Sequence, residues 1–132
     1  MRKDKILFEK LKNGELNSIQ IVPSYSIFSN YYDYILGYSN YKYWLRYLKR
    51  IIKKFEIKND NILELACGTG GFTKELSKIK CNLTALDLSK DMISRAREKK
   101  YFKNANINFT LGDIKNFKLK ERFDLVISFN DN

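Results

Sequence analysis

Residues 61–72 read NILELACGTGGF, an apolar segment that carries one acid and opens into a glycine-containing turn. Such a segment, followed by small residues and then by helical spacing of apolar residues, is typical of a strand, turn and helix in a nucleotide-binding α/β unit. Glycine has no Cβ, so the backbone of such a turn can pass close to a ligand. The segment therefore predicts an α/β fold with a ligand site at the end of its first strand.

The turn considered alone has two other interpretations, of which a dinucleotide site fits less well. A dinucleotide fingerprint starting at Gly68 requires glycine at position 73, where the chain has Thr73. That fingerprint also serves a pyrophosphate held at a helix N-terminus. A tight turn without any ligand fits as well, because short glycine turns are common between strands and helices. The sequence that follows the turn has to distinguish these alternatives.

A second short strand is predicted over residues 81–87, CNLTALD, which ends in the acid Asp87. Asp87 follows the glycine turn at close to the roughly 20-residue offset at which a carboxylate binds the ribose of a nucleotide. A carboxylate suits a pair of hydroxyls because its two oxygens can accept two hydrogen bonds at once. Ser89 is then predicted to cap a helix, with Asp91 in its first turn. The apolar face of this helix is predicted to consist of Met92, Ile93 and Ala96.

The third segment, residues 106–114, alternates apolar and polar residues and ends in Gly112-Asp113-Ile114. Strict alternation of this kind predicts a half-buried strand with Ile107, Phe109 and Leu111 on its buried side. A solvated turn is the simplest interpretation of Asp113 by itself. Three acids at the ends of successive apolar segments are a more specific pattern than any one of them.

Taken together, Glu64 with the glycine turn, Asp87 and Gly112-Asp113-Ile114 resemble class I S-adenosylmethionine (SAM) dependent methyltransferases. The resemblance is to the N-terminal, cofactor-binding part of that family, in a branch of small-molecule and uncharacterised members with an N-terminal aromatic helical cap. It implies an α/β Rossmann-like fold, SAM as cofactor and methyl transfer to a nucleophilic atom in one in-line displacement. A non-catalytic SAM-binding fragment and an RNA- or DNA-directed methyltransferase are the alternatives.

The resemblance also implies roles for individual residues. Glu64 would organise the turn and the methionine amino end of SAM, the turn glycines would allow close approach, and Asp87 would bind the ribose. Asp113 would accept from the adenine amine, and the amide of Ile114 would donate to the ring. The cofactor-binding residues implied in this way are Glu64, Ala66, Gly68, Gly70, Asp87, Leu88, Met92, Asp113, Ile114, Tyr25, Tyr32 and Trp44. Leu88 and Met92 are the candidates for packing on the adenine.

The fourth segment, residues 123–132, resembles the strand that ends beside the sulfonium and the methyl acceptor. Asp124 at its start is expected to have a structural role, and Asp131 is expected to face the substrate. The family fold has further strands and helices beyond this point. We therefore expect a fold truncated after the fourth strand, with that strand exposed at the edge of the sheet and available for self-association.

The N-terminal part of the chain is predicted to be helical. Residues 41–55 place apolar side chains at helical spacing with Lys and Arg largely on the other side. The aromatic residues Tyr25, Tyr32 and Trp44 resemble those that roof the cofactor cleft in one branch of the family, although ordinary core packing explains them as well. The predicted organisation is an extension at 1–24, a helical cap at 25–58 and a partial Rossmann-like SAM-binding domain at 59–132.

Composition limits the remaining functions. The chain has 25 Lys and Arg against 15 Asp and Glu, a net charge of +10 that would favour anionic partners. No nucleic-acid motif accompanies this charge, so nucleic acid is a possible but not a favoured partner. The chain has no histidine, and its two cysteines form no metal-ligand pattern. We expect a cytoplasmic enzyme that acts on a small-molecule acceptor without metal or membrane, and the residues suggest no catalytic base.

Overall fold

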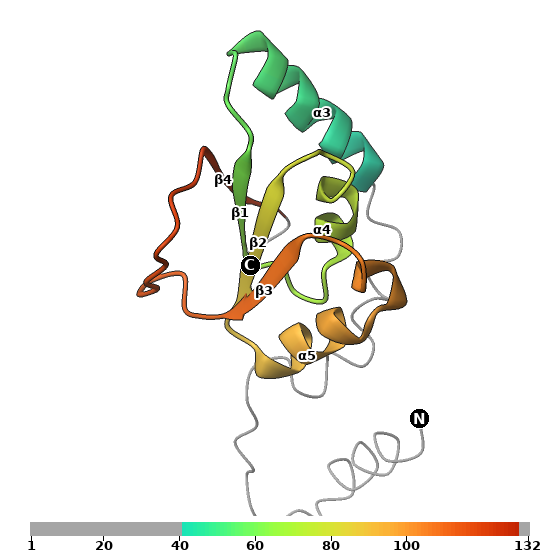
Figure 1. Ribbon diagram of the computed structural model, residues 1–132, viewed down its shortest axis with the longest axis vertical. Helices are drawn as coiled ribbons and strands as arrows, with labels where there is room; N and C mark the ends of the chain where they lie inside the picture. The colour runs from blue at the N-terminus through green and yellow to red at the C-terminus, as the bar shows by residue number, and fades with distance from the viewer. Residues whose placement is uncertain (1–40, 130–132) are drawn as a thin grey trace, which may run out of the picture.

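The computed structural model describes residues 41–129, which form one parallel sheet with helices packed on one side (Figure 1). An α/β fold is therefore confirmed. In chain order the elements are α3 (Tyr41–Lys54), β1 (Asn61–Leu65), α4 (Gly71–Leu76), β2 (Asn82–Asp87), α5 (Lys90–Glu98), the 3-10 helix η1 (Lys100–Phe102), β3 (Ile107–Leu111) and β4 (Leu125–Ser128).

The sheet has the strand order β3-β2-β1-β4, and every neighbouring pair is parallel. The chain builds outward from β1 to β3 and then returns to place β4 on the other side of β1. Ligands of open parallel sheets bind outside the carboxyl ends of the strands where the order reverses in this way. The order of the strands therefore places the expected site at the carboxyl ends of β1 and β4.

Two hydrophobic clusters hold the helices on the same face of the sheet. The first joins α3 and α4 to β1, β2 and β4 through Leu45, Leu48, Ile62, Phe72, Leu76, Leu83 and Ile127. The second joins α5 and η1 to β2 and β3 through Cys67, Ala85, Ile93, Ala96, Phe102 and Phe109. The connection over residues 112–124 runs on the opposite side of the strands in Figure 1. Each cluster buries the apolar side of short helices that could not be stable alone.

The helix predicted over residues 41–55 is α3, but its apolar stripe is less buried than the spacing indicated. Leu45 and Leu48 are buried, whereas 36% of Trp44 and 64% of Phe55 are exposed. Phe55 lies beyond the last helical residue, and Lys54 lies over its ring, 5.4 Å from the centroid. Phe55, the last apolar residue of the helical spacing predicted over residues 41–55, is therefore not part of the buried face.

The prediction for β3 was correct for the strand and wrong for one side chain. Phe109 is buried, but 52% of Leu111 is exposed. β3 is an edge strand of the described sheet, and Leu111 is its last residue. Alternation predicts which side a residue faces, but it cannot predict whether another element covers that position.

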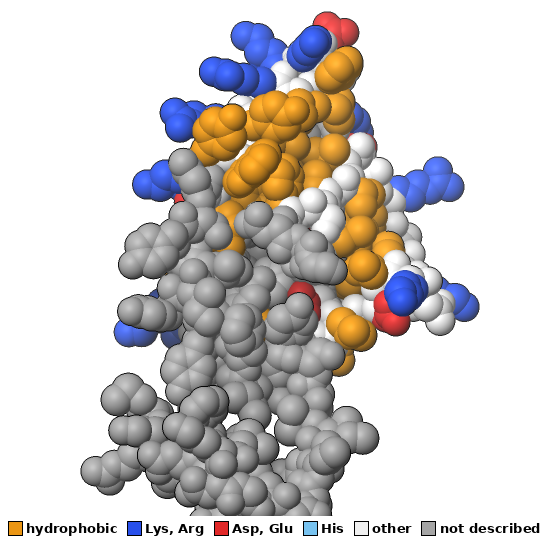
Figure 2. Space-filling view, turned by 180° about the vertical axis from the view of Figure 1, so that it is seen from behind, with side chains coloured by type: hydrophobic (Ala, Val, Ile, Leu, Met, Phe, Trp, Pro, Cys, Tyr) orange, Lys and Arg blue, Asp and Glu red, His pale blue; other side chains and the backbone are white. Residues whose placement is uncertain are grey.

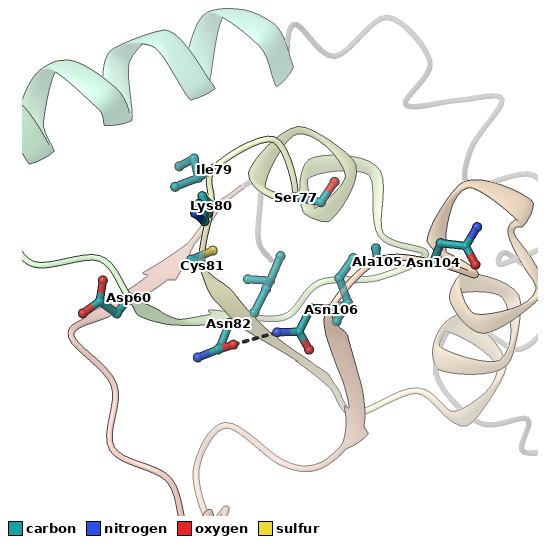
Figure 3. Close-up of a pocket in the computed structure, with 11 residues that line it drawn as sticks. Asp60, Ser77, Ile79, Lys80, Cys81, Asn82, Asn104, Ala105 and Asn106 are labelled. Carbon is teal, nitrogen blue, oxygen red and sulfur yellow. Dashed lines mark hydrogen bonds between the residues drawn. The ribbon is translucent and has the colours of Figure 1, made fainter.

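A row of asparagines joins the amino ends of three neighbouring strands. Asn82 Nδ2 donates to Asn61 Oδ1 over 2.9 Å. Asn106 Nδ2 donates to Asn82 Oδ1 over 2.6 Å, as the dashed line in Figure 3 shows. The open cavity of about 550 Å³ drawn in Figure 3 lies beside this row. It therefore lies at the amino ends of the strands, whereas the expected cofactor site lies at their carboxyl ends.

Candidate functional site

The turn after β1 has a left-handed backbone at three positions. The φ angles are 54° at Ala66, 56° at Gly68 and 85° at Gly70. A Cβ at Gly70 would lie only 2.8 Å from Cε2 of Phe102, so both conformation and space favour glycine there. Ala66 adopts the left-handed region without being glycine, a conformation that costs about 1–2 kcal/mol. The turn is therefore held in a conformation that the surrounding packing must impose.

Gly71, the first residue of α4, brings α3 against this turn. A Cβ on Gly71 would lie 2.7 Å from Cε2 of Tyr41, the first residue of α3. The Tyr41 ring also packs on the Phe72 ring, with 6.0 Å between the two ring centroids. Lys99 reaches the turn from the other side, where its Nζ donates to the carbonyl of Thr69 over 2.7 Å. The turn is thus packed between α3 and the segment that follows α5.

Glu64 lies inside β1 with only 2% of its surface exposed. The hydroxyl of Thr73 in α4 donates to Glu64 Oε2 over 2.5 Å. Burial raises the pKa of Glu64 to about 8; the Thr73 hydrogen bond works in the opposite direction, and the nearby charge of Asp87 adds to the rise. The hydrogen bond joins the strand before the turn to the helix after it.

Thr73 is a site residue whose role the sequence did not reveal. At the sequence level it counted only as a departure from the dinucleotide fingerprint. In the structure its side chain is fully buried and is the hydrogen-bond partner of Glu64. A threonine in the first turn of a helix, facing a buried acid on the preceding strand, is the signal that could have indicated this contact.

Asp87, the last residue of β2, connects the ends of three strands. Its Oδ2 accepts from the amide of Gly68 over 2.7 Å, and its Oδ1 accepts from the amide of Ser89 over 2.8 Å. Its carbonyl accepts from the amide of Gly112 over 2.9 Å. Each carboxylate oxygen has two lone pairs, so each can accept a further hydrogen bond. The carboxylate is fixed by the backbone but retains capacity for a ligand.

The helix that the sequence predicted after Ser89 is α5. Ser89 caps it by accepting from the amide of Met92 over 3.3 Å, and Asp91 lies in the first turn. Met92 is only 2% exposed, whereas 63% of Leu88 is exposed. Of these two candidates for packing on the adenine, Leu88 has an exposed side chain and Met92 is buried in the core.

Asp113 and Ile114 follow β3 on an exposed turn. Asp113 Oδ1 accepts from the amide of Lys115 over 2.8 Å, and half of Ile114 is exposed. Because Gly112 is bonded to Asp87, this turn begins directly beside the end of β2. The structure thus brings Asp87, Leu88, Asp113 and Ile114 together at the carboxyl ends of β2 and β3.

Trp44 and Asp124 lie near opposite ends of β4. The Trp44 ring packs 5.4 Å from the ring of Phe129, the residue that follows β4. Asp124 lies at the opposite end of β4, where its Oδ2 accepts from the amide of Asn61 over 2.9 Å. The expectation that Asp124 is structural is therefore supported by its hydrogen bond. Tyr25, Tyr32 and Asp131 lie outside the described residues.

Within residues 41–129 no cluster of acids and cysteines could hold a metal ion, and no helix is long and apolar enough to cross a membrane. Cys67 is buried in the turn, and burial raises the pKa of its thiol. This thiol is therefore not activated as a nucleophile. The chemistry of the described site consists of backbone donors, carboxylates and exposed apolar side chains.

Comparison of the sequence and comparison of the structure with known proteins both find methyltransferases. A family described as Methyltransferase domain matches residues 62–131. A malonyl-[acyl-carrier protein] O-methyltransferase from Bacillus cereus is 40% identical over 75 residues, which are 55% of this chain and 27% of that protein. Malonyl-[acyl-carrier protein] O-methyltransferase 1 from Ilyobacter polytropus is 33% identical over 100 residues, covering 70% of this chain and 37% of that protein.

A solved structure is also similar. It is an S-adenosylmethionine-dependent methyltransferase from Clostridium acetobutylicum, with a TM-score of 0.66 and 31% identity over 80% of this chain and 44% of that one. The chain therefore spans between about a quarter and less than half of the length of these relatives. The parallel sheet described above corresponds to a Rossmann-like methyltransferase fold that is truncated relative to this neighbour.

Proposed function

The chain belongs to the methyltransferase-domain family, and from this membership we propose that it forms the SAM-binding part of a methyltransferase that acts on a small acceptor group. The observation that carries the proposal is the arrangement around Asp87. A backbone-fixed carboxylate with free lone pairs lies at the end of β2, the exposed side chain of Leu88 follows it in the chain, and the exposed Ile114 lies on the turn that begins beside it at Gly112. This arrangement suits a ribose beside the flat, apolar faces of an adenine.

The proposed roles are those that the resemblance to the family implies. Asp87 accepts from the ribose hydroxyls, and Leu88 and Asp113 with Ile114 bind the adenine. Met92, the other candidate for packing on the adenine, is buried in α5. Gly68 and Gly70 permit close approach of the backbone, Ala66 belongs to the same turn, and Glu64 orders it and faces the methionine end. Trp44 with Tyr25 and Tyr32 would cover the site, and Asp131 would face the acceptor.

SAM, when bound, supplies a methyl group that its sulfonium already activates for transfer. The contribution of the chain is therefore to hold the cofactor in one orientation and to keep water out, which can lower the barrier by several kcal/mol. Residues 41–129 contain no side chain to which we assign proton transfer. A carboxylate acceptor would need no base, because its oxygen is already ionised at neutral pH.

The names of the relatives favour an acyl carboxylate as that acceptor. Both curated relatives described above are O-methyltransferases of a malonyl group on an acyl-carrier protein. We therefore propose a short acyl carboxylate as acceptor and a cytoplasmic location, where a buried reduced thiol such as Cys67 is stable. A chain that binds SAM without transferring its methyl group is the second candidate, favoured by the partial coverage of the relatives.

Calorimetric titration of the 132-residue chain with SAM tests the cofactor assignment. Binding should be measurable for SAM and absent for NAD. Asp87→Ala should weaken SAM affinity by roughly tenfold or more, because each hydrogen bond to a charged group contributes about 1.5–3 kcal/mol. Asp87→Asn should have a smaller effect, since one oxygen remains.

Asp124→Ala is the matched control, because Asp124 is also a strand-terminal aspartate with a backbone hydrogen bond but lies at the other end of the sheet. It should lower the midpoint of thermal unfolding and leave SAM affinity unchanged. Equal, small effects of both substitutions on SAM affinity would refute the site assignment. Transfer of labelled methyl from SAM to a malonyl thioester would then distinguish an enzyme from a SAM-binding fragment.

A further inference from the structure

The outer surface of α3 carries an unusual concentration of one charge. Within Tyr41–Lys54 there is no Asp or Glu, and all of its Lys and Arg are exposed: Lys42, Arg46, Lys49, Arg50, Lys53 and Lys54. Figure 2 shows Lys and Arg side chains projecting along the upper part of the molecule, around a group of hydrophobic side chains. We call the exposed residues from Lys42 to Lys54 the α3 outer face.

This charge is not neutralised within the described part of the chain. The two ion pairs among residues 41–129 are Lys58–Asp60 and Lys78–Glu75, and neither involves α3. The pairs Lys42–Arg46, Arg46–Arg50, Lys49–Lys53 and Arg50–Lys54 place like charges one turn apart, which destabilises a helix. The first turn also contains Lys42 and no acid, against the helix dipole. An anionic partner would relieve all of these repulsions.

Large aromatic side chains lie beside this charge. The exposed fraction is 51% for Tyr43, 36% for Trp44 and 47% for Tyr47. Their rings pack edge to face, with centroids 5.6 Å apart for Tyr43–Trp44 and 6.1 Å for Trp44–Tyr47. Exposed Tyr and Trp next to Arg are the residues that most often supply binding energy at protein interfaces.

The contacts of Trp44 favour a protein over a nucleic acid as the anionic partner. Nucleic acids bind aromatic surfaces by stacking bases on open ring faces. Here the indole is surrounded by the rings of Tyr43, Tyr47 and Phe129, all tilted or perpendicular to it. Exposed tyrosine and tryptophan rings packed edge to face offer ring edges and hydroxyls to a protein surface, and a basic surface favours an acidic one.

We propose that the α3 outer face docks an acidic protein that carries the methyl acceptor. This inference rests on the proposed function, because it supplies the partner of that site. The first residues of α3 contact both the glycine turn, through Tyr41 and Gly71, and the residue after β4, through Trp44 and Phe129. A protein docked on the first turns of α3 would therefore lie next to the carboxyl ends of the strands, where the cofactor would bind.

The test measures binding of an acidic acyl carrier protein in its apo form, which has no prosthetic arm and no acceptor. Because it cannot occupy the methyl-acceptor site, its binding reports on docking alone. The full chain should bind it in a salt-dependent manner by calorimetry. Arg46→Glu with Arg50→Glu should weaken this binding by about tenfold or more, and Tyr47→Ala by about fivefold.

Lys118→Glu with Lys120→Glu is the matched control, since both lysines are exposed and lie in the connection between β3 and β4. It makes the same change of net charge and should leave carrier binding unaltered. Arg46→Gln with Arg50→Gln provides a milder variant if charge reversal unfolds the helix, and circular dichroism checks the fold. SAM affinity should be the same in all these variants.

Three results would overturn the proposal. They are no carrier binding by the unmodified chain, equal losses in the α3 and control variants, and tighter binding of a single-stranded RNA 12-mer that the same Arg substitutions abolish. The SAM titration is independent of these results. Failure of SAM binding would refute the proposed function, whereas failure of carrier binding with SAM affinity intact would refute only the docking surface.

Discussion

At the scale of single residues, Glu64 shows how the turn is stabilised and what this costs. Its carboxyl group is buried in the strand, and among residues 41–129 it has one hydrogen-bond donor, the hydroxyl of Thr73. Removing a carboxylate from water disfavours its charged form, and one neutral donor offsets only part of that penalty. With a pKa of about 8, Glu64 is largely protonated in the folded chain at neutral pH.

The free energy of unfolding should therefore fall as the pH rises from the unfolded pKa of Glu64 to its folded pKa. The unfolded carboxyl titrates near its ordinary pKa of 4.5 and the folded one near 8, so the folded state binds the additional proton between these values. The stabilisation is complete below pH 4.5 and is lost by about pH 8, with an upper bound of roughly 5 kcal/mol. Urea unfolding at a series of pH values measures this change.

Glu64→Gln is the variant that isolates this effect, because an amide keeps an oxygen for Thr73 and carries no charge at any pH. Compared with the unmodified chain, it should gain stability progressively from pH 5 to pH 8. Glu121→Gln, at an exposed position in the connection between β3 and β4, should leave the pH profile unchanged. A pH profile for Glu64→Gln that parallels the unmodified one would contradict the assignment.

At the scale of elements, the parts predicted correctly depend on local chemistry. The glycine turn, the Ser89 cap and the acid that ends β2 are each specified within a few residues, so the sequence was sufficient. Leu111 was predicted incorrectly and Phe55 lies outside the buried face, because their exposure depends on which strand lies at the edge and where α3 ends. The Glu64–Thr73 bond was missed because it joins a strand to a helix, across the turn.

The contact between α3 and α4 gives a prediction that involves two elements. Gly71→Ala should destabilise the chain by about 1–3 kcal/mol, because the new Cβ would lie 2.7 Å from the ring of Tyr41. In a Tyr41→Ala background the same substitution should be neutral or stabilising by up to about 1 kcal/mol, since alanine is the better helix former. Urea unfolding of the four variants provides the double-mutant cycle.

Additive effects in that cycle would show that Tyr41 does not pack on Gly71 in solution. A coupling of about 1 kcal/mol or more would locate the docking of α3 at this contact. The contact also bears on function, because Gly71 begins the helix that follows the cofactor turn. Displacement of α3 by Gly71→Ala should therefore reduce SAM affinity as well, and the Tyr41→Ala background should remove that additional loss.

At the scale of the whole molecule, the described sheet has two edges of different character. β3 is flanked by α5 and begins beside the asparagine row, whereas β4 is joined to the sheet only through β1. About half of Val126 in β4 is exposed, while its neighbour Ile127 is buried against the helices. Strand edges with exposed β-branched residues tend to pair with another chain.

We expect the chain to self-associate through β4, as the sequence indicated. Val126→Lys should shift sedimentation toward the monomer at concentrations where the unmodified chain associates, because a lysine on an edge strand opposes pairing. Leu111→Lys introduces the same charge at the last residue of β3, the strand at the other edge of the sheet. Leu111 has the same 52% exposure as Val126, and this substitution should leave association unchanged. Equal shifts for both variants would attribute the effect to net charge, and a monomeric unmodified chain would exclude pairing through β4. Association that only Val126→Lys disrupts would identify β4 as the edge that pairs.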